Sequence, residues 1–223
     1  MNVVFFGGGG YALELYSYII DDIKISKKSI NVIGVYDAVS DCELLRHYPE
    51  LTYLGSIDEF KGGDFSCLIT IGNPISRALV HKIISPYADF FTYIHSSAIV
   101  SSSASIGMGV IIGPQNIISA KSSIGDNVCL NVFCGVGHGT QILESSVLGP
   151  YSLVNGDCSI GKACYLGTKV AIFPSTKIGN GVSVDAGSVV RNNIDDFTLC
   201  TQRVEQINLP NRIIKKSYFS IYE

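Results

Sequence analysis

The sequence of 223 residues has few charges, no tryptophan and only two methionines. Charged residues make up 16% of the chain and apolar residues 47%, a balance that argues against a disordered chain and against a coiled coil. The formal net charge of −3 leaves no basic excess to neutralise a nucleic-acid backbone. No apolar run reaches the roughly 18 residues that a membrane span needs. We therefore expect a globular chain that binds no nucleic acid and does not insert into a membrane.

Signals for export and for a disulfide framework are also missing. The chain begins MNVVFFG, without the basic segment and the small-residue cleavage site of a signal peptide. Its seven cysteines are odd in number and lack CxxC or Cys/His spacing, so the sequence predicts neither a disulfide framework nor a metal site. We expect reduced cysteines and a cytoplasmic location.

The second half of the chain carries a repeat of six residues. From Val100 to Val190 every sixth residue is Ile, Leu or Val, sixteen in succession without an insertion. The residue four positions later is small or of modest size, as at Cys134, Cys158 and Cys164. A period of six fits neither an α-helix nor a simple hairpin. It predicts a solenoid of short parallel strands whose aliphatic and small side chains point inward.

The first half alternates apolar strand segments with helical patterns, which predicts an α/β unit with a parallel sheet. Strands are expected at 2–6, 31–36, 66–71 and 90–94, one helix with Leu13, Tyr16, Ile19 and Ile20 facing the core, and another at 74–84 with Ala78, Leu79 and Ile83 facing the core. The predicted domains are a Rossmann-like domain at 1–95, a β-helix at 96–192 and a tail at 193–223 that caps or extends the β-helix.

A glycine-rich turn follows the first expected strand. Gly7, Gly9 and Ala12 satisfy the pattern G-x-G-x-x-G/A, in which backbone N–H groups and a helix N-terminus can approach a phosphate. The alternative is a strand–helix turn without a ligand. About 95 residues hold only half of a dinucleotide fold, so a mononucleotide or a nucleotide-linked sugar fits better than NAD.

Both halves together resemble the sialic acid O-acetyltransferase (NeuD)-like family of hexapeptide-repeat sugar acyltransferases. This family includes the N-acetyltransferases that act on nucleotide-linked 4-amino-4,6-dideoxy sugars in the bacillosamine and perosamine pathways. The resemblance rests on the glycine turn, Asp37, ITIGN at 69–73, IHSSAIV at 94–100 and the hexapeptides. It implies that the β-helix is left-handed and that a homotrimer binds acetyl-CoA between neighbouring β-helices.

The resemblance also implies three groups of site residues. The nucleotide-linked sugar, which could carry UDP, dTDP or GDP, would contact Gly8, Gly9, Gly10, Tyr11, Asp37 and Asn73; catalysis would use His138 and Asn131; CoA would contact Gly167, Thr168, Ala186 and Gly187. Tyr11 stands where the family usually has histidine. A tyrosine can still hydrogen-bond a phosphate or a sugar hydroxyl, but it carries no charge.

The chemistry is expected to depend on His138, the single histidine in the repeat. It is the third residue of its hexapeptide and should face outward, stacked on Ala120 and Gly156. Imidazole is suited to take a proton from an amine that attacks a thioester, and His138 matches the family's general base. The alternative is a surface histidine without a role.

A second departure from the family lies beside His138. Many members place a carboxylate directly after the histidine, and this chain has Gly139. Glu144 is expected on the adjacent face and is a poor substitute. Asp157, a neighbouring subunit or a backbone carbonyl could orient the ring instead.

The leading hypothesis is therefore an acetyl-CoA-dependent N-acetyltransferase that acts on a nucleotide-linked 4-amino-4,6-dideoxyhexose for lipopolysaccharide, O-antigen or another surface glycan. O-acetylation of a sugar hydroxyl is the first alternative. A non-catalytic scaffold that binds a nucleotide sugar is an alternative of another class. A metal enzyme of the carbonic anhydrase type would need about three histidines, whereas the repeat has one.

Overall fold

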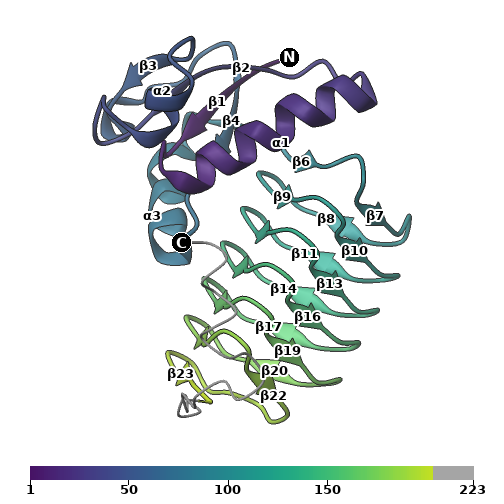
Figure 1. Ribbon diagram of the computed structural model, residues 1–223. Helices are drawn as coiled ribbons and strands as arrows, with labels where there is room; N and C mark the ends of the chain where they lie inside the picture. The colour runs from purple at the N-terminus through teal and green to yellow at the C-terminus, as the bar shows by residue number, and fades with distance from the viewer. Residues whose placement is uncertain (203–223) are drawn as a thin grey trace, which may run out of the picture.

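The computed structural model describes residues 1–202, which form an α/β domain stacked on one end of a long β-helix (Figure 1). The elements of the α/β domain are β1 (Asn2–Phe6), α1 (Gly10–Ser26), β2 (Asn31–Tyr36), α2 (Glu43–His47), β3 (Thr52–Gly55), the 3-10 helix η1 (Ile57–Glu59), β4 (Ser66–Ile69), α3 (Pro74–Ile84) and β5 (Asp89–Phe90). All five strands are parallel, in the order β3-β2-β1-β4-β5. The predicted parallel α/β architecture is thus confirmed.

The buried faces of the α/β helices match the prediction in part. In α1 Ile19 is buried and Tyr16 packs against the core, as predicted, and Ala12, Leu15 and Asp22 are buried as well. Hydrogen bonds satisfy the polar Asp22 in this position. In α3 the buried residues are Pro74, Arg77, Val80 and Ile84. The expectation that Leu79 faces the core is wrong, since its side chain is 57% exposed; Arg77 takes the inward position.

The segment expected as one strand at 90–94 is two. Strand β5 ends at Phe90 and pairs with β4, whereas β6 (Tyr93–Ile94) pairs with β9 of the β-helix. The chain therefore passes from one domain to the other within these few residues. The helix α2, the strand β3 and η1 were not predicted, because these short segments carry no clear hydrophobic period.

The β-helix consists of two-residue strands, which follow one another at intervals of six residues from β6 to β22, with β23 ten residues after β22. They are β6, β7 (Ile99–Val100), β8 (Ser105–Ile106), β9 (Ile111–Ile112), β10 (Ile117–Ile118), β11 (Ser123–Ile124), β12 (Cys129–Leu130), β13 (Gly135–Val136), β14 (Gln141–Ile142), β15 (Val147–Leu148), β16 (Leu153–Val154), β17 (Ser159–Ile160), β18 (Tyr165–Leu166), β19 (Ala171–Ile172), β20 (Lys177–Ile178), β21 (Ser183–Val184), β22 (Val189–Val190) and β23 (Leu199–Cys200). Up to β22 every third strand joins the same parallel sheet, so the coil has three flat faces.

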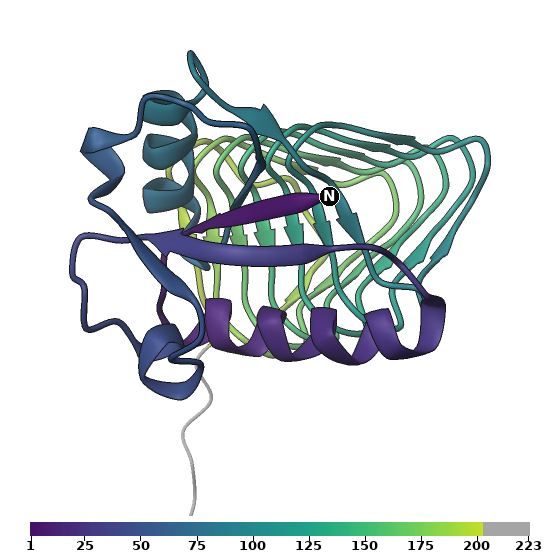
Figure 2. The same cartoon turned by 90° about the horizontal axis from the view of Figure 1, so that it is seen from above.

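We name the three faces by their first strands. The β6 face holds β6, β9, β12, β15, β18, β21 and β23; the β7 face holds β7, β10, β13, β16, β19 and β22; the β8 face holds β8, β11, β14, β17 and β20. The view along the coils shows their triangular outline (Figure 2). The aliphatic residues of the repeat and Cys134, Cys158 and Cys164 form one internal core, as the period predicts.

The α/β domain covers part of the β6 face. Outward residues of that face, among them Ile111 and Cys129, belong to the same buried cluster as Phe5 and Leu15. Arg77 of α3 reaches the corner between the β8 and β6 faces and donates to the backbone carbonyl of Asn127. The two domains are therefore joined by a continuous apolar core and by a buried cation.

The predicted tail falls only partly within the described residues. Strand β23 pairs with β21 and extends the β6 face by one strand; the role of the whole tail stays a prediction. Residues 203–223 lie outside the described residues. Within residues 1–202, no helix combines the length and the apolar character that a membrane span requires.

Candidate active site

His138 lies at the corner between the β7 and β8 faces, two residues after the end of β13. Its side chain is 71% exposed, as the third position of the hexapeptide predicts. Gly156, on the next coil, leaves room for the ring: a Cβ at position 156 would lie only 2.6 Å from both Nε2 and Cε1 of the imidazole. The imidazole therefore stacks on a backbone that carries no side chain.

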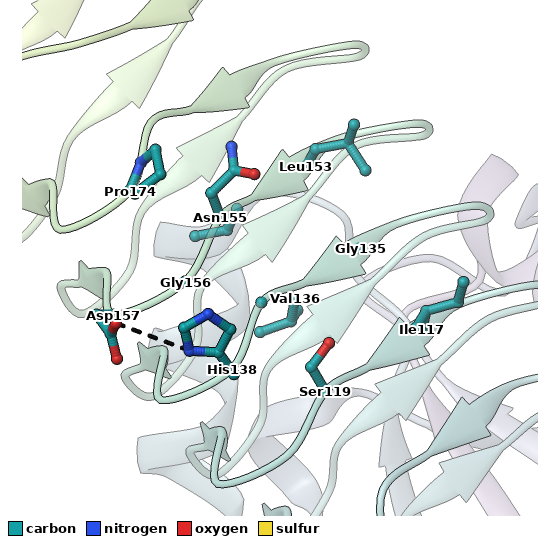
Figure 3. A pocket seen from close by; sticks show the side chains of 12 residues that line it. Ile117, Ser119, Gly135, Val136, His138, Leu153, Asn155, Gly156, Asp157 and Pro174 are labelled. Atoms are coloured by element: carbon teal, nitrogen blue, oxygen red, sulfur yellow. Dashed lines mark ion pairs between the residues drawn. The ribbon is translucent and has the colours of Figure 1, made fainter.

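A cavity of about 440 Å³ opens beside this imidazole. Its floor is the β7 face, with Ile117 and Leu153 at its sides, and His138 and Asp157 lie at one edge (Figure 3). Asn155 and Pro174 line the wall on the later coils. The site thus joins an apolar surface to one titratable ring, an arrangement typical of a ligand pocket.

The carboxylate nearest to His138 comes from the following coil. Asp157 Oδ2 lies 3.7 Å from His138 Nδ1, and the backbone N–H of Asp157 donates to the carbonyl of His138 at 2.8 Å. Glu144 instead forms an ion pair with Lys162. Of the partners that the sequence left open, Asp157 is the one that this chain brings to the ring.

Asn131 and the four residues expected to contact CoA lie along a different edge, the corner between the β6 and β7 faces. The backbone N–H of Gly187 donates to the carbonyl of Thr168 at 2.8 Å, and Gly167 packs directly against Ala186. The Asn131 side chain accepts from the N–H of Val132 at 2.7 Å. None of the five lines the cavity around His138. Within one chain, the β7 face separates this edge from the imidazole.

The glycine turn and Asp37 meet at the carboxyl end of the α/β sheet. The backbone N–H of Gly8 donates to Asp37 Oδ2 at 2.6 Å, and that of Val39 donates to Oδ1 at 3.1 Å. Gly9 is the N-cap of α1, and both Gly9 and Gly10 are exposed. These glycines leave open backbone at a helix N-terminus, which suits an approaching ligand.

Tyr11 points away from that open turn. Cys129 Sγ, on β12, donates to the Tyr11 hydroxyl at 2.9 Å. Burial, together with the neighbouring Cys129, raises the pKa of Tyr11 well above its usual value, so the hydroxyl stays neutral. The structure places this side chain in the contact between the two domains, where its partner was not visible from the sequence.

Asn73 caps α3 and borders a second cavity. Its Oδ1 accepts from the N–H of Ser76 at 2.9 Å. The cavity, of about 370 Å³, lies between the start of α3 and the later coils of the β-helix, and Tyr165 and Ser183 line it. Sequence reasoning missed these two residues. Their outward strand positions on the covered β6 face were the available signal.

No cluster of three or more His, Cys, Asp or Glu side chains suited to a metal ion occurs among residues 1–202. The polar side chains that line the cavity are the imidazole of His138, the carboxylate of Asp157, the amide of Asn155 and the hydroxyl of Ser119. Such groups can move a proton and donate hydrogen bonds, which is what acyl transfer to a nucleophile requires.

Solved structures of sugar acetyltransferases share this architecture. Two variants of perosamine N-acetyltransferase from Caulobacter crescentus, each in complex with CoA and GDP-perosamine, are 26% and 27% identical to the chain and match it with a TM-score of 0.74. Each match covers 88% of this chain and 91% of the other. The acetyltransferase domain of PglB from Neisseria gonorrhoeae, 21% identical with a TM-score of 0.73, covers 88% and 93% and shares the fold.

Among curated proteins, the lipopolysaccharide biosynthesis O-acetyl transferase WbbJ of Escherichia coli is 31% identical over 130 residues. The match covers 56% of this chain and 55% of WbbJ, so the chain spans about half the length of this relative. It spans 31% of the bifunctional protein GlmU of Acinetobacter baylyi, at 27% identity over 57% of the chain. No profile of a known protein family matches the chain.

A left-handed parallel β-helix behind a small α/β domain, with an exposed histidine at a corner of the coil, defines the class of hexapeptide-repeat acyltransferases. The resemblance to hexapeptide-repeat acyltransferases that was drawn from the sequence is confirmed by these structural neighbours.

Proposed function

We propose that this protein transfers an acetyl group from acetyl-CoA to the amine of a nucleotide-linked amino sugar. The observation that carries the proposal is the exposed imidazole of His138, stacked on Gly156 at the edge of an open cavity. The match to perosamine N-acetyltransferase along 88% of the chain supports the class of both substrates. A 4-amino-4,6-dideoxyhexose is our preferred acceptor.

In the proposed reaction the acceptor amine attacks the carbonyl carbon of the thioester directly. His138 takes one proton from the amine as the C–N bond forms and delivers it to the CoA sulfur as the C–S bond breaks. The products are the N-acetyl sugar and the free CoA thiol. No nucleophilic side chain is needed, which fits the buried positions of Cys134 and Cys158.

We assign the nucleotide-linked sugar to the glycine turn and Asp37, with Asn73 and the cavity beside Tyr165 on the path toward the β-helix. Acetyl-CoA is assigned to the edge of Gly167, Thr168, Ala186 and Gly187, with Asn131 as a donor to the developing oxyanion. Because His138 lies across the β7 face from that edge, we propose that two copies of a homotrimer complete each site. The cytoplasmic location remains a prediction from the sequence.

O-acetylation of a sugar hydroxyl is the second candidate, and the match to WbbJ favours it. A hydroxyl is a weaker nucleophile than an amine and depends more on the general base. The experiment is to follow CoA thiol release with GDP-, UDP- and dTDP-linked 4-amino-4,6-dideoxy sugars and with the corresponding 4-hydroxy sugars. We expect turnover with an amino sugar only. Turnover with hydroxyl acceptors alone would replace the proposal by O-acetylation, and no thiol release with any acceptor would leave a binding protein.

His138→Ala tests the base. We expect it to lower turnover by roughly 10²- to 10⁴-fold without changing the melting temperature, since the exposed ring makes no buried contact. His47→Ala, at an exposed histidine on α2, is the matched control and should keep full activity. Near-normal turnover of the His138 variant would remove the base from the proposal.

A further inference from the structure

We propose that Asp157 is the positioning residue of His138 and that the following coil supplies it in place of a side chain at position 139. The inference rests on the proposed function, because it concerns the same imidazole. Its basis is the geometry of three residues: the ring of His138, the carboxylate of Asp157 and the empty position at Gly139 (Figure 3).

The Asp157 carboxylate fills the volume that a side chain at position 139 would need. Gly139 adopts φ +65°, in the left-handed region, and a Cβ at this position would lie 2.3 Å from Asp157 Oδ1. A side chain at 139 and the observed carboxylate therefore exclude each other. The residue directly after the histidine has no side chain, and the carboxylate from the next coil fills the vacant volume.

Two other aspartates of the β-helix accept a hydrogen bond from a backbone N–H at a corner of the preceding coil, whereas the Asp157 carboxylate does not. Asp126 accepts from the backbone N–H of Met108 at 2.8 Å, and Asp196 accepts from that of Asn180 at 2.7 Å. Both stand 18 or 16 residues beyond the N–H that they bind, on the next coil. Within residues 1–202 the Asp157 carboxylate has no backbone N–H donor, so it is free to act on the ring that faces it.

The two ring nitrogens of His138 have different surroundings. Nδ1 faces Asp157 Oδ2 at 3.7 Å, whereas Nε2 lies over Gly156 beside the cavity. A gap of 3.7 Å is longer than a hydrogen bond, and such catalytic contacts often shorten when the substrate binds. A carboxylate on the Nδ1 side favours the tautomer with its proton on Nδ1 and stabilises the imidazolium. Nε2 then keeps its lone pair for the amine.

Asp157→Asn separates this role from a structural one. Among the described residues, Asp157 is the charged group that faces the ring. On the preceding coil, Lys121 stands at the position equivalent to Gly139. An amide in place of the carboxylate can donate to Nδ1 and so favours the tautomer with its proton on Nε2, which leaves no lone pair there for the amine. We expect ¹⁵N NMR of the neutral His138 ring in the full chain to show this change of tautomer, and kcat to fall roughly 10- to 100-fold.

Moving the carboxylate by one coil provides the rescue test. In the double variant Gly139→Asp/Asp157→Gly the carboxylate would occupy the same space, and we expect the ring to return to the tautomer of the wild type. Asp126→Ala is the matched control: it removes the acceptor for the N–H of Met108 and should lower the melting temperature without changing the tautomer of His138. An unchanged ring tautomer in Asp157→Asn would overturn the inference even if His138→Ala is inactive. An active His138→Ala would instead contradict the proposed function.

Discussion

At the scale of single residues, Asp37 shows how one side chain serves both the fold and a binding site. Its two carboxylate oxygens hold the N–H groups of Gly8 and Val39, and its own carbonyl accepts from the Tyr53 hydroxyl. These bonds keep the glycine turn in a fixed position relative to the next loop. A nucleoside that docks there would meet a turn that is already ordered, which lowers the entropy cost of binding.

We predict that Asp37→Ala raises the KM for the nucleotide-linked sugar about 10-fold or more and changes kcat less, because uniform binding is lost while the base is untouched. Steady-state kinetics with acetyl-CoA held saturating would measure both constants. Asp41→Asn, at a nearby exposed aspartate, is the control and should leave them unchanged. A fall in kcat with a constant KM would assign the nucleotide elsewhere.

The positions of His138 and Asp157 could be read from the sequence because the hexapeptide period fixes them. Counting six residues per strand places His138 outward and stacks Gly156 on it, and the structure has both. The direction of Tyr11 could not be read in this way. Its hydroxyl meets Cys129, which is 118 residues away, and no local period links the two.

At the scale of elements, the β-helix was predictable strand by strand, whereas α3 was predictable in extent but not in its buried face, and α2 was not predictable. Each coil repeats the same backbone, so the aliphatic position of the hexapeptide locates every strand from β7 to β22. The range of α3 follows from Pro74 at its start. Its buried face does not follow from hydrophobicity, because Arg77 is fully buried and Leu79 is exposed.

Arg77 is buried because backbone carbonyls from both domains surround its guanidinium. Nε donates to Asn127 at 2.6 Å, Nη1 to Ile69 at 2.5 Å and Nη2 to Gly109 at 3.3 Å. Burial lowers the pKa of this group, and its hydrogen bonds compensate for part of the lost hydration. The side chain therefore couples α3 to the β-helix.

We predict that Arg77→Met lowers the free energy of unfolding by about 3 kcal/mol or more, because buried carbonyls lose charged donors. Urea unfolding followed by circular dichroism would measure the loss, and the α/β domain should unfold before the β-helix. Arg46→Met is the matched control, since the ion pair of Arg46 with Asp41 is exposed and contributes less than about 1 kcal/mol. Equal stability of the two variants would contradict this account of the domain contact.

At the scale of the whole molecule, the three faces of the β-helix differ in what covers them. The α/β domain covers part of the β6 face, and the outward strand positions of the β8 face are Ser, Gln or Lys. The β7 face instead presents Ile99, Ile117 and Leu153, which are 65%, 52% and 52% exposed. Exposed apolar residues in one row indicate a surface that another protein covers. A second copy of the chain on this face would also close the cavity of His138.

This arrangement leads to a prediction about shared sites. His138 and the edge of Thr168 lie on opposite sides of the β7 face, so a copy that lacks one should be complemented by a copy that lacks the other. Thr168 is exposed, and Thr168→Trp should block the CoA edge without disturbing the fold. We expect His138→Ala and Thr168→Trp each to be inactive alone, and a co-expressed equal mixture to recover about a quarter of wild-type turnover, as random assortment of a two-chain site requires.

The measurement is CoA thiol release by the co-purified mixture, with the same two variants mixed after separate purification as the control. Subunits that do not exchange should stay inactive in that control, which ties the recovery to mixed assemblies. A third variant, Leu153→Asp, places a charge on the β7 face and should dissociate the assembly in sedimentation velocity. If the co-expressed pair shows no recovery although mixed assemblies form, each active site belongs to a single chain, and the residues that bind CoA must then lie on the same edge of the coil as His138.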